Sequence, residues 1–361
     1  MAVTNDLVTD RRVLRHAAAL REAGHEVVLL GRKEVPTRHS RGWRFYLEFN
    51  IALRRKLSEQ NPDIVWANDT DTLPGCWMAC RPRVHKAKLV MDAHEIFPEV
   101  PEIQRKPFVK WVWRTIERWM MPGCDALLTV CNSVAEYYRL RYTVSMTVVR
   151  NLPDNEECGI KKEELTGEPD NSSFLIPHSS LKTLLYQGKV NLGRGVDWAI
   201  DALEWLPQCR LVVAGDGDLL EQMKAYAADK PWSDRVLFMG RMLPEDLERL
   251  TPQADVGLVM LENMGLNYYY ALPNRIGDFV QAGVPMVVSD LPEMAAVVRR
   301  FGVGEVIGRL HGTDEKAQAR ALARAVEKVL EKSRGGYDFT EARKDMDWNK
   351  EKNKLLECVN A

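Results

Sequence analysis

The sequence predicts an α/β protein with two consecutive domains, each built on a parallel β-sheet covered by helices. Three observations lead to this fold class. Short continuous runs of Val and Leu alternate with helical stretches, hairpin signals are few, and the alternation stops at a polar segment and then restarts. The 361 residues suffice for two domains that each bury a hydrophobic core.

The first half contains five stretches that we expect to form strands. All are continuous apolar runs, as strands buried on both faces of a sheet should be. They are His25–Gly31, Asp63–Asn68, Lys88–Ala93, Ala126–Val130 and Thr147–Asn151. Helical stretches lie between them, and the first, Arg11–Ala23, is followed by Gly24, a residue favoured just after a helix.

The second half contains six more runs of the same kind. They are Thr183–Gly188, Arg210–Gly215, Arg235–Gly240, Asp255–Met260, Pro285–Ser289 and Glu305–Ile307. Between the halves lies Pro153–Ser180, a polar segment without a clear period, which we interpret as an interdomain linker. A last helix is expected at Trp348–Val359, and its packing partner does not follow from the periodicity.

Composition excludes several classes of protein. Lys and Arg total 50 and Asp and Glu 51, so no overall charge attracts the chain to nucleic acid. With 45% hydrophobic and 28% charged residues the chain is globular, and it has no apolar run long enough to cross a bilayer. We do not expect its first residues to be a signal peptide. The seven scattered cysteines, without a Cys-x-x-Cys pair, indicate thiols in the reducing cytoplasm.

A basic, glycine-rich loop follows the strand that ends at Gly188. It contains Lys189 and Arg194, with Gly193 and Gly195. Ligands of open parallel sheets bind outside the carboxyl ends of the strands, which is where this loop is expected. Glycines let the backbone approach an anion, and Lys with Arg neutralise phosphate oxygens. The pattern predicts a phosphate site, and the alternative is an ordinary basic loop.

A second anion-binding feature lies in Ala271–Arg275. We expect Pro273 in the first turn of a helix that ends before Gly283, so that backbone N–H groups point out of its start. One turn beyond Asn274 comes Asp278, whose carboxylate has the oxygens to accept two hydrogen bonds from a ribose diol. Alternatively, Asp278 simply caps or solvates the helix.

In the first half, Asp92 and His94 share one face at the end of a predicted strand. A histidine there is placed to hydrogen-bond a substrate hydroxyl, although a structural histidine fits the spacing equally well. The remaining histidines show no metal-ligand spacing.

Several familiar signatures are absent. The glycine–lysine pair at 188–189 is followed by Val190, so there is no P-loop, and the turn Asn5–Asp10 has no glycine for an NAD site. The triplets Asp69–Asp71 and Asp216–Asp218 resemble metal-binding motifs. Because each lies where a helix is expected to start, we interpret them as helix caps and predict no metal site.

The segment Arg105–Met121 combines cations with tryptophans. Its spaced residues are Lys106, Lys110, Arg114 and Arg118, interleaved with Trp111, Trp113 and Trp119. A basic, Trp-bearing helix is typical of binding to an anionic membrane surface. The alternative is a solvated basic face over tryptophans that pack into the domain.

Short motifs, some of which contain the residues named above, are distributed along nearly the whole chain. In order they are Asp10–Val13, Ala23–Val27, Met91–Glu95, Val149–Pro153, Tyr186–Lys189, Ala271–Asp278, Ala282–Pro285 and Ser289–Asp290. Their shared order resembles the retaining glycosyltransferases of the GT-B fold, family 4. This resemblance implies two Rossmann-like domains facing across a cleft. Residues 1–165 would bind the acceptor and residues 175–340 the nucleotide sugar, with a final helix in 345–361 packing back on the first domain.

The resemblance also implies a donor site. Its pyrophosphate-binding cations fall on Lys189 and Arg194, its ribose-binding acid on Asp278, and an earlier Glu of the family on Tyr270. The implied donor-binding residues are Gly188, Gly240, Arg241, Met242, Leu272, Pro273, Asn274 and Asp278.

The implied reaction uses a UDP- or GDP-linked sugar and no metal or other cofactor. Lys189 and Arg194 would stabilise charge on the departing diphosphate, and His94 would position the donor sugar. For the acceptor, the first domain would supply Asp10, Asn68 and Glu95.

The expected activity is transfer of a hexose-type sugar to a glycan or lipid-linked glycan with retention, in surface polysaccharide or lipopolysaccharide biosynthesis. The expected partners are the nucleotide sugar, the acceptor and an anionic membrane surface, but no nucleic acid. We expect a cytoplasmic protein, peripheral on the inner face of the membrane. Two alternatives remain: another GT-B enzyme such as a nucleotide-sugar epimerase, and a non-catalytic nucleotide-sugar-binding subunit, to which Tyr270 points.

Overall fold

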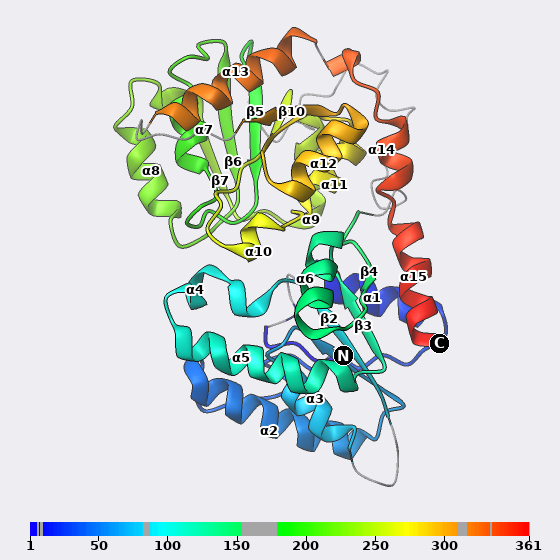
Figure 1. Ribbon diagram of the computed structural model, residues 1–361. Coiled ribbons are helices and arrows are strands. Elements are labelled where there is room, and N and C mark those ends of the chain that lie inside the picture. The colour runs from blue at the N-terminus through cyan, green and yellow to red at the C-terminus, as the bar shows by residue number, and fades with distance from the viewer. Residues whose placement is uncertain are drawn as a thin grey trace. The chain divides into compact units, whose positions relative to one another are not determined.

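The computed structural model describes residues 1–5, 7, 10–81, 87–153, 179–308, 316–332 and 334–360. The chain divides into two compact units, each with one parallel sheet (Figure 1). Unit 1 comprises Met1–Asn151, Gly265–Tyr270 and Asn349–Ala361, and unit 2 comprises Leu152–Met264 and Ala271–Trp348. Most of the predicted linker, residues 154–178, lies outside the described residues.

Unit 1 is built on four parallel strands in the order β1-β2-β3-β4. They are β1 (Ile64–Asn68), β2 (Lys88–Ala93), β3 (Ala126–Thr129) and β4 (Thr147–Val148). The interior positions of β1, β2 and β3 are buried, which explains why these strands are continuous apolar runs in the sequence.

The strand predicted at His25–Gly31 is wrong in its extent. Of this run, Leu30 makes an isolated parallel bridge to Ala2, which also bridges Ala67 of β1. The N–H of Ala2 donates to the carbonyl of Trp66 at 2.8 Å. The carbonyl of Val28 accepts a hydrogen bond from the amino group of Met1 at 2.8 Å, but no regular strand forms, and the Val28 side chain is exposed. The first three residues therefore lie between Leu30 and β1.

Unit 1 contains helices from the first half of the chain and two helices from later in the chain. They are α1 (Arg11–Glu22), α2 (Gly42–Gln60), α3 (Leu73–Ala79), α4 (Pro101–Gln104), α5 (Pro107–Met120), α6 (Asn132–Tyr142), α10 (Leu266–Tyr269) and α15 (Trp348–Asn360). Helices α2, α3 and α5 lie together on one side of the sheet (Figure 1). Helix α15 is tied to unit 1 by Glu351, which accepts hydrogen bonds from Arg150 at 2.8 to 3.0 Å.

Unit 2 has six parallel strands in the order β10-β9-β8-β5-β6-β7. They are β5 (Lys182–Gln187), β6 (Cys209–Ala214), β7 (Val236–Gly240), β8 (Val256–Val259), β9 (Met286–Ser289) and β10 (Gly304–Ile307). This is the strand order of a Rossmann fold: β5, β6 and β7 extend the sheet in one direction, and β8, β9 and β10 extend it in the other, starting beside β5. Ligands of such sheets bind at this reversal, outside the carboxyl ends of the strands.

The helices of unit 2 cover both faces of its sheet. They are α7 (Val196–Ala202), α8 (Leu220–Ala228), α9 (Pro244–Leu250), α11 (Arg275–Ala282), α12 (Pro292–Phe301), α13 (Ala317–Glu331) and α14 (Thr340–Asp345). Helices α7 and α13 pack together on one face, and α11 and α12 lie on the other (Figure 1). This two-sided cover buries the strands that the apolar runs predicted.

Candidate functional site

The loop between β5 and α7 starts at Gly188, whose φ of +130° favours glycine. A Cβ on the neighbouring Gly215 would lie 1.7 Å from the carbonyl oxygen of Gly188, so the loops after β5 and β6 are in direct contact. The N–H of Val190 donates to the carbonyl of Asp216 at 2.8 Å. The loop after β6 therefore fixes the shape of the glycine-rich loop.

This loop carries both predicted cations. The exposed ammonium of Lys189 lies 2.7 Å from Asp216 Oδ1, and this hydrogen bond lowers the pKa of Asp216. Arg194 is half-buried, and its backbone N–H donates to the carbonyl of Asn191 at 3.2 Å. Because a solvent-exposed ion pair is weak, an anionic ligand could replace Asp216 as the partner of Lys189.

Asp278 lies in the first turn of α11 and is held by Gln187, the last residue of β5. The side-chain amide of Gln187 donates to Asp278 Oδ2 at 3.0 Å. On its other side, Gln187 Oε1 lies 3.0 Å from Thr251 Oγ1. The structure thus brings Asp278 to the end of β5, where the glycine-rich loop begins.

Arg275 is a further residue of this site that sequence reasoning did not single out. It is buried, its Nη1 donates to the carbonyl of Gln187 at 2.8 Å, and its guanidinium lies 4.7 Å from the ring centroid of Tyr186. A Cβ on Gly188 would lie 3.4 Å from the same nitrogen. Arg275 therefore holds the start of the loop in place through its hydrogen bond to the carbonyl of Gln187. Its place in the Ala271–Arg275 motif was the available signal.

The start of α11 differs from the prediction. The helix begins at Arg275 with Asn274 as its N-cap, so Pro273 precedes the helix instead of occupying its first turn. Pro273 still contributes there, because its carbonyl accepts the N–H of Ile276 at 3.0 Å. Leu272 and Pro273 are half-buried and Asn274 is exposed.

The remaining predicted donor-binding residues lie at the end of β7 and directly after it. Gly240 has a φ of +69°, and it is followed by the exposed Arg241 and the half-buried Met242. Since β5, β6 and β7 are parallel neighbours, these residues lie at the same sheet edge as Gly188.

In unit 1, His94 follows β2 and is half-buried. Its backbone N–H donates to Asp69 Oδ1 at 2.7 Å. Its ring nitrogens Nδ1 and Nε2 each lie 3.4 Å from a carboxylate oxygen, of Asp69 and Asp92 respectively. Burial alone would lower the pKa of His94, but the two carboxylates outweigh it and raise the pKa. The structure therefore favours a protonated His94.

Asp69 connects the ends of β1 and β2 in a strained conformation. Its φ is +62°, a region that costs a residue other than glycine about 1 kcal/mol or more. Its N–H donates to the carbonyl of Asp92 at 2.9 Å, while its carboxylate accepts from His94. The conformation is thus maintained by bonds that also place His94.

Asp92, the second carboxylate beside His94, is fully buried. Arg12 donates to both carboxylate oxygens of Asp92, at 2.6 and 2.9 Å, and His16 Nδ1 lies 3.2 Å away. Burial would raise the pKa of Asp92, but Arg12 and His94 hold it well below the usual value. Burial, together with Arg12, lowers the pKa of His16 to about 4. Asp92 is therefore a fixed negative charge.

The capping interpretation of the two Asp-x-Asp triplets is wrong. Neither α3 nor α8 has a side-chain hydrogen bond at its N-cap. Instead, Asp71 accepts from Thr4 Oγ1 at 2.5 Å, and burial raises the pKa of Asp71 to about 6. Asp69 contacts His94 and Asp216 contacts Lys189. Each triplet thus supports a predicted site residue, which local sequence does not reveal.

Two of the three predicted acceptor-binding residues have structural roles. Asn68 is fully buried and donates to the carbonyl of Ala2 at 2.9 Å, so we correct this prediction. The carboxylate of Asp10 caps α1 by accepting from Val13 at 3.1 Å. Glu95 is half-buried and accepts from the side-chain amide of Asn267 at 3.0 Å.

A buried carboxylate lies beside this network. Glu117 of α5 accepts from the hydroxyls of Thr70, Tyr138 and Tyr142 at 2.9, 3.1 and 2.6 Å. Burial raises its pKa from 4.5 to about 7, although the three hydroxyls oppose this shift. The bond to Thr70 fixes the segment between Asp69 and Asp71.

This burial makes stability depend on pH. The unfolded chain releases the Glu117 proton at lower pH than the folded chain, so the free energy of unfolding falls by up to about 3 kcal/mol as pH rises from 4.5 to about 7. Glu117→Gln should lack this fall, as measured by urea unfolding at about pH 5 and about pH 8. The exposed control Glu59→Gln should follow the wild type. Parallel pH dependences for wild type and Glu117→Gln would contradict the assignment.

Two absences concern only the part of the chain that the structure describes. Within it, no three His, Cys, Asp or Glu side chains form a group suited to a metal ion. None of its helices combines the length and apolar character needed to cross a bilayer.

Two family models match the chain, one in each half. The model described as Glycosyltransferase Family 4 matches residues 9–156, and that described as Glycosyl transferases group 1 matches residues 181–332. No curated protein matches the sequence.

Many solved structures resemble the chain at low sequence identity. A glycosyltransferase from Rickettsia africae has a TM-score of 0.71 at 14% identity, covering 99% of this chain and 96% of that one. Anabaena HepE in complex with UDP-glucose has a TM-score of 0.67 at 14% identity, covering 99% and 98%. WaaG, a glycosyltransferase involved in lipopolysaccharide biosynthesis, has a TM-score of 0.64 at 16% identity, covering 100% and 95%.

Two parallel-sheet α/β units with these structural neighbours define the GT-B fold. The two matching models cover most of both halves. The chain belongs to the family 4 (group 1) glycosyltransferases.

Proposed function

We propose that the protein transfers a hexose-type sugar from a UDP- or GDP-linked donor to a glycan or lipid-linked glycan acceptor, with retention. The observation that carries this proposal is the arrangement after β5 in unit 2, where Lys189 and Arg194 share one loop and Gln187 holds Asp278 beside its start. HepE, a relative in fold, is known in complex with UDP-glucose. WaaG supports a role in surface polysaccharide or lipopolysaccharide biosynthesis.

Each side chain of the donor site has a proposed task. Lys189 and Arg194 neutralise the two phosphates, so that no metal is required, and Asp278 accepts hydrogen bonds from the ribose hydroxyls. The backbone of Gly240–Met242 holds the base, and Leu272–Asn274 line the phosphates at the start of α11. His94 donates a hydrogen bond to a hydroxyl of the donor sugar.

The proposed reaction exchanges one bond at the anomeric carbon. The bond to the leaving phosphate oxygen breaks, the bond to the acceptor oxygen forms on the same face, and the acceptor proton passes to the leaving phosphate. The products are a glycoside and a nucleoside diphosphate. Residues 1–165, with the helix in 345–361, serve the acceptor and residues 175–340 the donor.

We place this activity in the cytoplasm, on the inner face of the membrane. Free thiols support a reducing compartment. In the described part of the chain they are Cys76, Cys80, Cys124, Cys131, Cys209 and Cys358.

Calorimetry with UDP, GDP and their sugars tests the proposal. We expect micromolar to millimolar binding of one nucleotide diphosphate, on the order of ordinary substrate affinities, and slow release of that nucleotide from its sugar donor in the absence of acceptor. Absence of binding to every nucleotide would refute the donor site.

A non-catalytic nucleotide-sugar binder is the second candidate. Tyr270, where the family has a Glu, favours it, and its carbonyl is engaged by the thiol of Cys131 at 3.2 Å. A binder would bind the donor tightly but never release free nucleotide from it. The hydrolysis measurement therefore separates the two candidates.

A further inference from the structure

A groove of about 500 Å³ lies along one face of α6 in unit 1. Most of its lining residues recur every three or four positions along this helix, which places them in a single stripe. Tyr270, the residue that follows α10, adds a side chain from a distant part of the sequence. We call this cavity the α6 groove, defined by Ser133, Glu136, Tyr137, Leu140, Arg141 and Tyr270.

The α6 groove begins at the edge of the sheet where His94 lies. His94 follows β2, and Cys131, the N-cap of α6, follows the neighbouring parallel strand β3. The hydroxyl of Tyr138 in α6 donates to the carbonyl of Glu95 at 3.3 Å. The thiol of Cys131 donates to the carbonyl of Tyr270 at 3.2 Å, which ties Tyr270 to the start of α6. A ligand that extends away from His94 along α6 therefore enters the groove.

Aromatic and apolar side chains form one part of the groove lining. Tyr137 is half-buried, and because its hydroxyl oxygen is fully buried, the ring is the part that lines the groove. Tyr270 is also half-buried, and Leu140 is 71% exposed. The C–H faces of a pyranose pack against such rings, and a few polar groups around them fix the orientation of a ligand. This lining suits a sugar ring.

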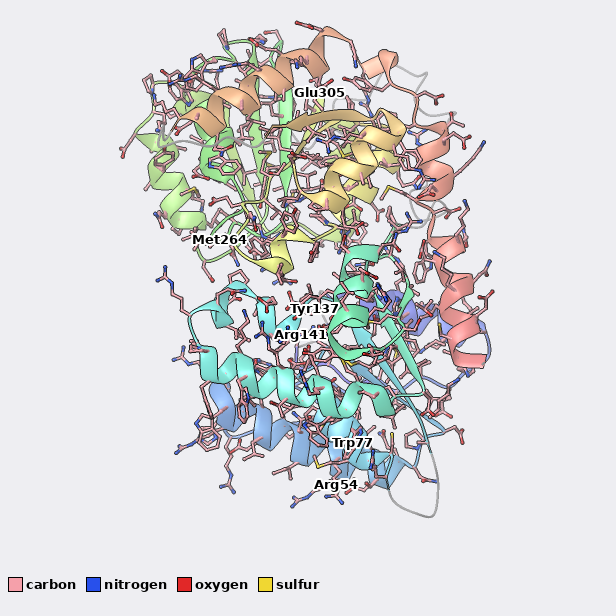
Figure 2. The ribbon with its side chains drawn as sticks, viewed as in Figure 1. Arg54, Trp77, Tyr137, Arg141, Met264 and Glu305 are labelled. Atoms are coloured by element: carbon pink, nitrogen blue, oxygen red, sulfur yellow. The ribbon has the colours of Figure 1, made fainter. Side chains whose placement is uncertain are left out.

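The charge of the groove comes from Arg141. Its guanidinium lies 6.0 Å from the ring centroid of Tyr137, and Figure 2 shows the two side chains next to each other on α6. Among the described residues, no carboxylate forms an ion pair with Arg141. The other charged lining residue, Glu136, is bound at 2.6 Å through each oxygen by Arg139. The groove therefore presents a cation whose planar fork matches a carboxylate or a phosphate group.

We propose that the α6 groove binds an acidic sugar unit of the acceptor, a pyranose that carries a carboxylate or a phosphate group. The rings of Tyr137 and Tyr270 pack against this pyranose, and Arg141 binds its anionic group. The inference rests on the proposed function, in which the acceptor is a glycan, and it narrows that acceptor to an acidic one. Since Asn68 and Asp10 have structural roles, the acceptor needs contacts of this kind elsewhere in unit 1.

Ligand-observed NMR titration of the full-length protein tests the inference. The probes are methyl β-glucuronide, glucose 6-phosphate and the neutral methyl β-glucoside. We expect a dissociation constant of about 1 mM for at least one acidic sugar, which is typical of a ligand of this size, and about tenfold weaker binding of the glucoside. Whichever acidic sugar binds tighter identifies the anionic group. Equal binding of all three sugars, or no binding of either acidic one, would overturn the proposal.

Charge variants locate the bound sugar. Arg141→Gln should weaken binding of the acidic sugar about tenfold, and because Arg141 is exposed, the fold should tolerate this change. Arg55→Gln, at an exposed arginine of α2 in the same unit, is the matched control and should bind like the wild type. Arg194→Ala should also leave this binding unchanged. If Arg194→Ala weakened it and Arg141→Gln did not, the sugar would occupy the phosphate site of unit 2 and the proposal would be wrong.

A ring variant tests the aromatic part of the groove. Tyr270→Leu keeps an apolar side chain but removes the ring, and it should weaken binding of the acidic sugar about fivefold or more. Tyr226→Leu, at a half-buried tyrosine of α8, is the control. Nucleotide binding by Tyr270→Leu, measured by calorimetry on the same sample, should equal that of the wild type. Loss of nucleotide affinity with unchanged sugar binding would assign Tyr270 to the donor site and contradict the inference. Because nucleotide binding is measured separately, failure of the groove is distinguished from failure of the proposed function.

Discussion

Replacing Arg194 with alanine should weaken binding of the preferred nucleoside diphosphate about 10- to 100-fold and leave binding of the free nucleoside nearly unchanged. A hydrogen bond to a charged group contributes about 1.5 to 3 kcal/mol, and the nucleoside has no phosphate to lose. Lys189→Ala should act in the same way, because Lys189 follows Gly188 in the same loop. Calorimetry with nucleoside and diphosphate measures both effects.

The effect on catalysis should be larger than that on binding. Negative charge on the phosphates grows as the sugar departs, so loss of either cation should lower kcat about 100- to 1,000-fold. Asp216→Asn removes the carboxylate that binds Lys189, and this variant should bind diphosphate at least as tightly as the wild type. Lys224→Ala, at an exposed ion pair on α8, is the control. Equal losses for nucleoside and diphosphate would show that these cations do not contact phosphate.

The sequence predicts the sheets better than their edges. Buried parallel strands need apolar residues on both faces, so β2 (Lys88–Ala93) matches its prediction residue for residue. The run His25–Gly31 has similar composition, but a strand also needs a partner, and here only Leu30 bridges to Ala2. Pairing is a property of the tertiary structure, which a local pattern does not contain.

The same reason limits prediction of the site. Gly188 and Lys189 follow from the rule that ligands bind at strand ends. Asp69 was misinterpreted because a carboxylate before a helix is usually a cap, whereas its partner, His94, follows a different strand. Arg275 was passed over because its contact, the carbonyl of Gln187, is also remote in sequence.

His94→Ala should lower kcat about 100-fold with little change in nucleotide binding. If His94 positions the donor sugar as proposed, its loss misplaces the reacting carbon, and a misplacement of about 1 Å costs about that factor. Kinetics with the matching donor and calorimetry with the nucleoside diphosphate separate the two effects. An equal loss of nucleotide affinity would contradict a role limited to the sugar.

Asp69→Asn should shift the pH dependence of kcat/KM. The charged and titratable groups that interact with His94 include Asp69, Asp92, Arg12, His16 and, more weakly, Asp71. Burial raises the pKa of Asp69 to about 8, although His94 opposes this shift. At the alkaline limb, set by the pKa of His94 at about 9, the Asp69 carboxylate is therefore charged and stabilises the imidazolium, so removing its charge lowers the pKa of His94. The alkaline limb of the kcat/KM profile should then move to lower pH by about one unit.

The fold should survive this change, because Asn adopts the left-handed conformation of residue 69 more readily than Asp and still accepts the N–H of His94. Asp71→Asn, which alters a carboxylate bonded to Thr4, is the matched control and should shift the limb less. If kcat fell in Asp69→Asn while the limb stayed in place, Asp69 would only shape the backbone. A shifted limb at nearly normal stability requires the charge of Asp69 to act on His94.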